Sequence, residues 1–208
     1  MLRLTVCFLI TVFLLVVIAT RCAESFATVS RLTNTPDHVL NLNPTISDDG
    51  RTIAFESSAD LANTGGTASF RLLQTDLSSF VELGATRAIC PALTAEGRTI
   101  VFASSEDLVG RNPDRNSEIF LFDGVKLNQL TETKPESEAL RLGDGNFQPS
   151  ISSDGRIIAY SSPGEIVIYD TLERKFTHLT NDGAENPKVS GDGTRVYYKR
   201  NLTADNAD

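Results

Sequence analysis

The sequence predicts an all-β fold built from a repeated antiparallel sheet, and three observations lead to this prediction. Four segments of twelve residues align without gaps, and each opens with proline and carries an acidic residue followed by glycine at the same place. Each of these Asp-Gly or Glu-Gly turns joins two short apolar runs, which is the pattern of a β-hairpin. Beyond the N-terminal segment, no stretch of the chain shows helical periodicity.

Each repeated segment is expected to form the first two strands of a sheet. The copies are PTISDDGRTIAF (44–55), PALTAEGRTIVF (91–102), PSISSDGRIIAY (149–160) and PKVSGDGTRVYY (187–198). Proline is expected at the start of the first strand, because it offers no N–H to a ladder. Glycine then makes the turn, since it accepts a positive φ. The second strand is an uninterrupted apolar run, which is typical of a strand packed on both faces.

Two further strands complete most of the units. The third strand reads EIFLFD at 118–123 and EIVIYD at 165–170, and the closing strand ends in Leu-Thr at 130–131 and 179–180. The first unit is more degenerate, with its last two strands expected at 70–76 and 80–83. A unit of four antiparallel strands over roughly 40 residues matches one blade of a β-propeller.

The predicted fold class is therefore a β-propeller of four-stranded antiparallel blades, incomplete or open, with about three and a half blades present. The units lie near 44–84, 91–131, 149–180 and 187–208. Because a propeller closes with at least about four blades, we expect either a fragment of a larger propeller or a ring that another chain completes. Residues 29–33 are a candidate ring-closing strand for the last blade, and open blade edges favour self-association.

The repeat resembles that of the TolB-like (WD40-like) β-propeller family. The run Leu-Thr, spacer, Pro-x-apolar-Ser-x-Asp-Gly and then x-Ile-Ala-Phe carries the resemblance, and LTNDGAENPKVSGDG (179–193) is the clearest copy. The resemblance covers residues 32–198. It implies a propeller fold and a periplasmic scaffold that binds other proteins, although propellers support many unrelated functions.

The N-terminal segment, residues 1–27, is predicted to be a signal peptide. Residues 4–20 form an apolar run, and the small residues Ser25 and Ala27 suit cleavage after Ala27. Cleavage after Ala23 and an uncleaved membrane anchor are the alternatives, since the apolar run is at the lower edge of a spanning length. A cleaved signal places the mature chain in the periplasm or outside the cell.

Composition limits the classes of partner. The formal net charge is -8, which argues against nucleic acid or an anionic membrane surface as a partner. Membrane contact is expected only if the N-terminal segment remains uncleaved. Cys7 and Cys22 leave with the signal, so Cys90 has no disulfide partner and is expected to be a small buried hydrophobe.

One loop is a candidate calcium site. Asn112, Asp114, Asn116 and Glu118 place oxygen ligands at alternate positions, a pattern that can wrap a hard cation. Arg115 in the same loop opposes a cation, and the alternative is a polar turn in which Asn and Asp bond to the backbone. No other cofactor is expected.

The acidic residues of the turns are expected to be structural, because they recur in every unit whereas a catalytic pair would be unique. They are Asp49, Glu96, Asp154 and Asp192. The chain also has no nucleophile elbow, no phosphate-binding glycine loop and no metal-ligand spacing of His and Cys. We therefore expect no catalytic residues.

These observations favour an exported, non-catalytic propeller that acts as a protein-binding scaffold. The alternatives are the propeller portion of a serine peptidase of the prolyl-oligopeptidase class, whose chemistry resides in a separate domain, or a sugar-active propeller enzyme. The sequence names no particular protein partner.

Export of the full chain tests the predicted signal. In a bacterial secretory host the mature protein is expected to begin at Thr28, which N-terminal sequencing of the exported fraction will show. Ala27→Asp should block cleavage, because the processing site needs a small residue, whereas Ala23→Asp should leave it unchanged. A chain that keeps Met1 and sediments with membranes would establish the anchor instead.

Overall fold

The computed structural model describes residues 29–134 and 145–200. The predicted signal peptide lies outside these ranges. Within them, no helix is long and apolar enough to cross a membrane. The chain divides into two units, residues 1–34 and 35–208, and every strand belongs to the second.

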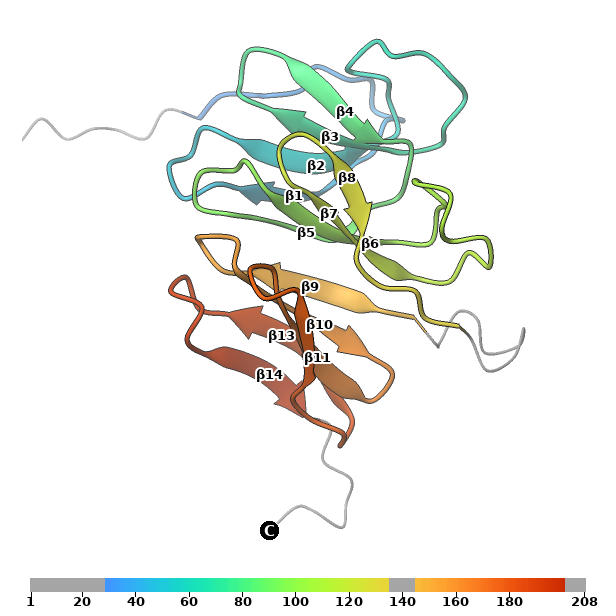
Figure 1. The fold of residues 1–208 in the computed structure, drawn as a ribbon. Helices are drawn as coiled ribbons and strands as arrows, with labels where there is room; N and C mark the ends of the chain where they lie inside the picture. The colour runs from blue at the N-terminus through green and yellow to red at the C-terminus, as the bar shows by residue number, and fades with distance from the viewer. Residues whose placement is uncertain (1–28, 135–144, 201–208) are drawn as a thin grey trace, which may run out of the picture. The chain divides into compact units, whose positions relative to one another are not determined.

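The described strands of the second unit form three four-stranded antiparallel sheets and one two-stranded sheet (Figure 1). The first sheet has the order β1 (Asn41–Ile46), β2 (Ile53–Ser57), β3 (Arg71–Thr75), β4 (Phe80–Gly84), and the second has β5 (Ile89–Leu93), β6 (Ile100–Ser104), β7 (Glu118–Phe122), β8 (Leu127–Gln129). The third has β9 (Phe147–Ile151), β10 (Ile157–Ser162), β11 (Glu165–Asp170), β12 (Lys175–His178), and the fourth has β13 (Ala184–Val189) and β14 (Val196–Arg200). The first strands of neighbouring sheets contact each other, β1 with β5, β5 with β9 and β9 with β13.

The predicted ring-closing strand at residues 29–33 is wrong. The structure assigns no strand to residues 29–34, and the Arg31 Nε donates instead to the nearby Thr33 carbonyl at 2.8 Å. A strand exists only where a second strand completes its ladder, and none of the described strands pairs with this segment.

Each repeated proline lies inside its strand and not at its start, which corrects the sequence-based expectation. Every first strand has a register shift at this point, and the residue just before proline has a left-handed backbone. These residues are Asn43 (φ 49°), Cys90 (φ 52°), Gln148 (φ 53°) and Asn186 (φ 56°). A β-bulge leaves a residue out of the ladder, so a proline with no N–H is tolerated there and on an edge strand.

The same bulge overturns the prediction for Cys90. Its thiol is free and the residue is exposed, because it occupies the left-handed position of the edge strand β5 and not one of the inward positions of the ladder.

Alternate residues of the second strands β6 and β10 pack against different neighbours, which confirms the predicted two-sided burial for these two sheets. On β6, Ile100 and Phe102 pack against the first sheet, while Val101 and Ala103 pack against the third. The Phe102 ring stacks on Phe120, with centroids 5.7 Å apart. A further cluster joins the third and fourth sheets. The core is therefore a series of layers between sheets, as in the blades of a propeller.

A chain of backbone hydrogen bonds joins the turns of successive sheets. The Asp48 N–H donates to the Ala95 carbonyl at 3.0 Å, and the Ala95 N–H donates to the Ser153 carbonyl at 3.0 Å. The Ser153 N–H then donates to the Gly191 carbonyl at 2.9 Å. These four residues hold the same place in the four repeats, so one such hydrogen bond joins each pair of neighbouring sheets at this end. We call this series the inter-sheet ladder.

The turn acids are structural, as predicted, in three of the four repeats. Asp49 accepts the Ser47 hydroxyl at 2.7 Å and the Arg51 N–H at 3.0 Å. Asp154 and Asp192 accept the same two kinds of donor. These bonds favour the ionised carboxylate and hold the pKa of each of the three acids below its ordinary value.

Gly97→Ala is expected to destabilise the chain more than Gly50→Ala, although both turn glycines have a left-handed backbone, with φ of 70° and 72°. A Cβ at residue 97 would lie 2.3 Å from the Thr52 Cβ of the neighbouring sheet, whereas a Cβ at residue 50 meets nothing within 4 Å. We expect a loss of about 1–2 kcal/mol for Gly50→Ala from its left-handed φ, and about 1–3 kcal/mol more for Gly97→Ala from the overlap. Urea unfolding of both variants measures this, and equal losses would contradict the close approach.

Candidate functional site

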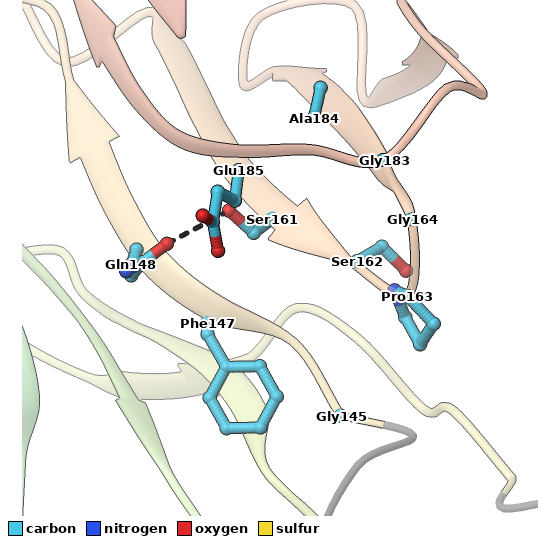
Figure 2. Close-up of a pocket in the computed structure, with 10 residues that line it drawn as sticks. All are labelled: Gly145, Phe147, Gln148, Ser161, Ser162, Pro163, Gly164, Gly183, Ala184 and Glu185. Carbon is cyan, nitrogen blue, oxygen red and sulfur yellow. Dashed lines mark hydrogen bonds between the residues drawn. The ribbon is translucent and has the colours of Figure 1, made fainter. Parts of the chain in front are cut away.

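A pocket of about 430 Å³ opens between the third and fourth sheets, at the end of the strands opposite the Asp-Gly turns (Figure 2). It is lined by Gly145, Phe147, Gln148, Ser161, Ser162, Pro163, Gly164, Gly183, Ala184 and Glu185. These residues come from the start of β9, the end of β10 with its following turn, and the start of β13. We call this end of the sheets the rim.

The polar side of the pocket is a shared hydrogen-bond network. The Ser161 hydroxyl donates to Gln148 Oε1 at 3.2 Å. The Asn186 N–H points between these two groups and is 2.9 Å from both Gln148 Oε1 and Ser161 Oγ. Because Gln148 and Ser161 belong to the third sheet and Asn186 to the fourth, the network positions the pocket walls relative to each other.

Bare backbone and one ion pair form the rest of the pocket's edge. The Gly183 N–H donates to the Gly164 carbonyl at 2.8 Å, and both glycines have a left-handed φ with open space where a Cβ would stand. Lys199 Nζ donates to Glu185 Oε1 at 2.8 Å, and both side chains are partly exposed. The wall at this edge is therefore backbone without side chains, and a paired charge lies beside it.

At the rim of the first sheet, the positions that correspond to Gln148 and Ser161 carry a different set of polar groups. The fully buried Glu56 accepts from Asn43 Nδ2 at 2.5 Å and from Arg87 Nε at 2.8 Å. The Arg87 guanidinium also lies over the Phe70 ring, 4.5 Å from its centroid. Asn43 and Glu56 correspond in the repeat to Gln148 and Ser161. One backbone arrangement thus presents a carboxylate in one sheet and a hydroxyl in another.

The predicted calcium loop lies on the same rim, beside a second pocket of about 320 Å³ that Asn112, Asp114 and Glu118 help to line. Asn112 Nδ2 donates to the Asn116 carbonyl at 2.9 Å, and Asn116 Nδ2 donates to the Thr133 carbonyl at 2.6 Å. These are the bonds of a polar turn. Asn116 Oδ1 is buried without a hydrogen-bond partner, so the loop keeps one acceptor to offer a cation, and the calcium site stays a prediction.

Glu118 is a buried carboxylate at the start of β7. It accepts from the Thr131 hydroxyl, from the Thr133 N–H at 2.5 Å and from Asn146 Nδ2 at 2.9 Å. Burial raises the pKa of Glu118, and these three donors oppose the rise. Its oxygens are thus occupied by groups of the chain itself.

The Leu-Thr pairs also have a defined role, which sequence alone did not assign. Thr131 Oγ1 accepts from the Ile119 N–H at 2.9 Å, and Thr180 Oγ1 accepts from the Ile166 N–H at 2.9 Å. Each threonine therefore ends the closing strand by holding the start of the third strand. In the third sheet His178 Nδ1 lies 2.9 Å from both carboxylate oxygens of Glu165.

Sequence reasoning missed Gln148, Ser161 and Glu56, since polar residues within apolar repeats gave no spacing to recognise. Gln148 could have been found from its position just before a repeated proline, and Ser161 and Glu56 from their positions on the paired second strand. These positions become informative only when the bulge is known. Within the described ranges, no group of three or more His, Cys, Asp or Glu side chains could hold a metal ion.

No protein-family model and no curated protein sequence matches the chain. Among solved structures, a protein assigned as TolB from Agrobacterium tumefaciens is 17% identical with a TM-score of 0.55, over 81% of this chain and 56% of that chain. An oligogalacturonate lyase solved with manganese is 12% identical with a TM-score of 0.53, over 79% of this chain and 48% of that one. A prolyl endopeptidase is 20% identical with a TM-score of 0.48, over 77% and 24%.

At these identities the likeness to the first two structures shows the fold, which is that of a β-propeller and confirms the sequence prediction. The described sheets form an array of blades that does not close into a ring. This chain spans just over half the length of the TolB structure that it matches.

Glu118→Gln is expected to destabilise the chain by about 1–3 kcal/mol, because the new amide Nε2 would face donors that now bind a carboxylate oxygen. Glu132→Gln is the matched control. Glu132 forms an ion pair with Arg111, with both side chains about half exposed, so this change should cost less than about 1 kcal/mol. Urea unfolding of both variants gives the difference. A Glu118→Gln variant as stable as the parent would show that the three donors do not require a carboxylate.

Proposed function

We propose that this chain is an exported, non-catalytic propeller that binds a protein partner at the rim. The observation that carries the proposal is the residue before each repeated proline. Asn43, Cys90, Gln148 and Asn186 share one left-handed backbone conformation, and three kinds of side chain occupy it. A constant backbone whose side chain varies along the array suits recognition of one extended surface, whereas chemistry needs groups that converge.

The pocket between the third and fourth sheets is the proposed anchor point. Phe147, Pro163 and Ala184 give it apolar walls, and the peptide groups of Gly164 and Gly183 lie at its edge. Such a mixture suits a small apolar side chain of the partner, and the glycine edge, which carries no side chains, lets the partner's backbone come close.

The carboxylates of the rim support binding over catalysis. Glu56 and Glu118 are buried and hydrogen-bonded on both oxygens. A general acid or base must instead reach the proton that it transfers. Their bonds hold sheets and loops in place, which is the work of a scaffold.

Export to the periplasm or the cell exterior is part of the proposal. It rests on the N-terminal apolar segment with its small-residue cleavage site, together with the TolB-like repeat. A protein partner in that compartment would meet an acidic chain, so a basic or mixed partner surface is favoured.

A photoreactive amino acid at Pro163 should cross-link a discrete partner in an extract of the source organism's exported fraction. The same group at Val125, which is 81% exposed on the outer turn between β7 and β8, should not. The purified partner then allows a direct binding measurement. Ser162→Trp fills the pocket and is expected to weaken binding roughly tenfold or more, equivalent to about 1.4 kcal/mol.

Ser79→Trp, in the exposed turn between β3 and β4, is the matched control and should bind as the parent does. Equal cross-linking at both positions, or full affinity in the Ser162→Trp variant, would rule out the rim as the binding surface.

A further inference from the structure

A second point on the rim, between the first and second sheets, presents one arginine side chain in a fixed orientation. Its residues are Glu56 near the end of β2, Phe70 just before β3, and Arg87 in the connection from β4 to β5. We propose that the Arg87 guanidinium binds a carboxylate of the protein partner. The inference rests on the proposed function and deepens it, because it names the chemical group that the rim recognises at this point.

The repeat brings the same two positions together wherever neighbouring sheets meet at the rim. One position lies four residues before the repeated proline, and the other lies just before the third strand. The pairs that they form are Arg87 with Phe70, Gly145 with Ser117, and Gly183 with Gly164. The last two pairs consist of glycines and one small side chain, whereas the first is a cation on an aromatic ring. Among these described contacts, the array therefore presents a charged group at the first alone.

Two contacts hold the Arg87 guanidinium in one orientation. Its Nε donates to Glu56 Oε2 at 2.8 Å, and its Cζ lies 4.5 Å from the centroid of the Phe70 ring. The Glu56 side chain is fully buried, and its other oxygen accepts from Asn43 Nδ2 at 2.5 Å. Because the carboxylate is itself held in place, the guanidinium is pre-organised, and a ligand loses little free energy in ordering it.

The outer end of the guanidinium is open. Within the described ranges, neither Nη1 nor Nη2 of Arg87 donates to another group of the chain. The side chain is 55% exposed, although its partner Glu56 is fully buried. The N–H groups of Nη1 and Nη2 form a fork whose geometry matches the two oxygens of a carboxylate. A carboxylate is therefore the group that this end of the side chain is shaped to bind.

A guanidinium that already holds one carboxylate can hold a second, and Arg156 of the same chain shows this. Its Nη2 lies 2.9 Å from Asp170 Oδ2 and 3.9 Å from Glu173 Oε1. The pair of Glu56 and Arg87 has no net charge, so a singly charged carboxylate is favoured over a doubly charged phosphate. An acidic group here and an apolar group at the pocket give the partner the mixed surface that an acidic chain favours.

Titration with three short capped peptides tests the site without the partner. The first peptide carries one glutamate, the second carries glutamine in its place, and the third carries glutamine and a free C-terminal carboxylate. NMR of the mature chain follows the Arg87 Nε–Hε signal and the backbone amides of Arg71 and Ala88. These signals should shift to saturation with a carboxylate peptide and stay unchanged with the second. The tighter of the two carboxylate peptides shows whether a side chain or a chain terminus is bound.

Three variants show which group binds the peptide. Arg87→Lys keeps the charge and the pairing with Glu56 but loses the fork, so the affinity for the carboxylate peptide should fall roughly tenfold. Phe70→Leu keeps both charges and removes the ring that orients the guanidinium, so it should weaken binding severalfold. Arg51→Gln removes an exposed arginine at the opposite end of the sheet and should bind as the parent does.

The outcomes separate this inference from the proposed function. A parent whose signals do not saturate with either carboxylate peptide would overturn the inference, as would equal shifts with the second peptide or parental affinity in Arg87→Lys. If these results appear while Ser162→Trp still weakens binding of the partner, the inference alone fails. If the carboxylate peptides bind at Arg87 but the group at Pro163 captures no discrete partner, the proposed function fails and the carboxylate site remains.

Discussion

Each full sheet between two neighbours must bury both of its faces, and the rest of the structure depends on this constraint. Adjacent residues of β6, such as Phe102 and Val101, belong to different inter-sheet cores. Removing one sheet would therefore expose apolar surface on both of its neighbours. This explains the uninterrupted apolar runs, and it explains why apolar side chains remain exposed at both ends of the array.

The turns hold neighbouring sheets together through a small number of hydrogen bonds. One backbone hydrogen bond joins each pair of neighbouring turns, while in three of the four repeats the turn acid bonds to the groups that close its own hairpin. Because these bonds hold the sheets at the end with the turns, the side chains at the opposite rim can vary between repeats. Three kinds of side chain occupy one backbone arrangement along the rim, which is how a repeat fold combines a constant frame with a specific surface.

Much of the fold follows from the sequence, because hairpins are local. The third strands at 118–123 and 165–170 and the two-stranded fourth sheet follow the repeat, since the turn and the apolar run lie next to each other in the chain. The errors concern long-range register. Proline was placed at a strand start and Cys90 in the core, because a bulge arises only when two strands pair. The pocket residues Gln148 and Ser161 were missed for the same reason.

By itself, the sequence determined the repeat, its strand order within each blade and the structural role of three of the four turn acids, because short-range spacing and turn chemistry specify all of these. Only the tertiary structure decided which faces of the sheets are covered and where the bulges place side chains. It also decided how Glu56 and Glu118 are hydrogen-bonded and where the inter-sheet ladder ends. Those properties depend on contacts between residues far apart in the chain, and the free energy of burial is settled only when the sheets are packed together.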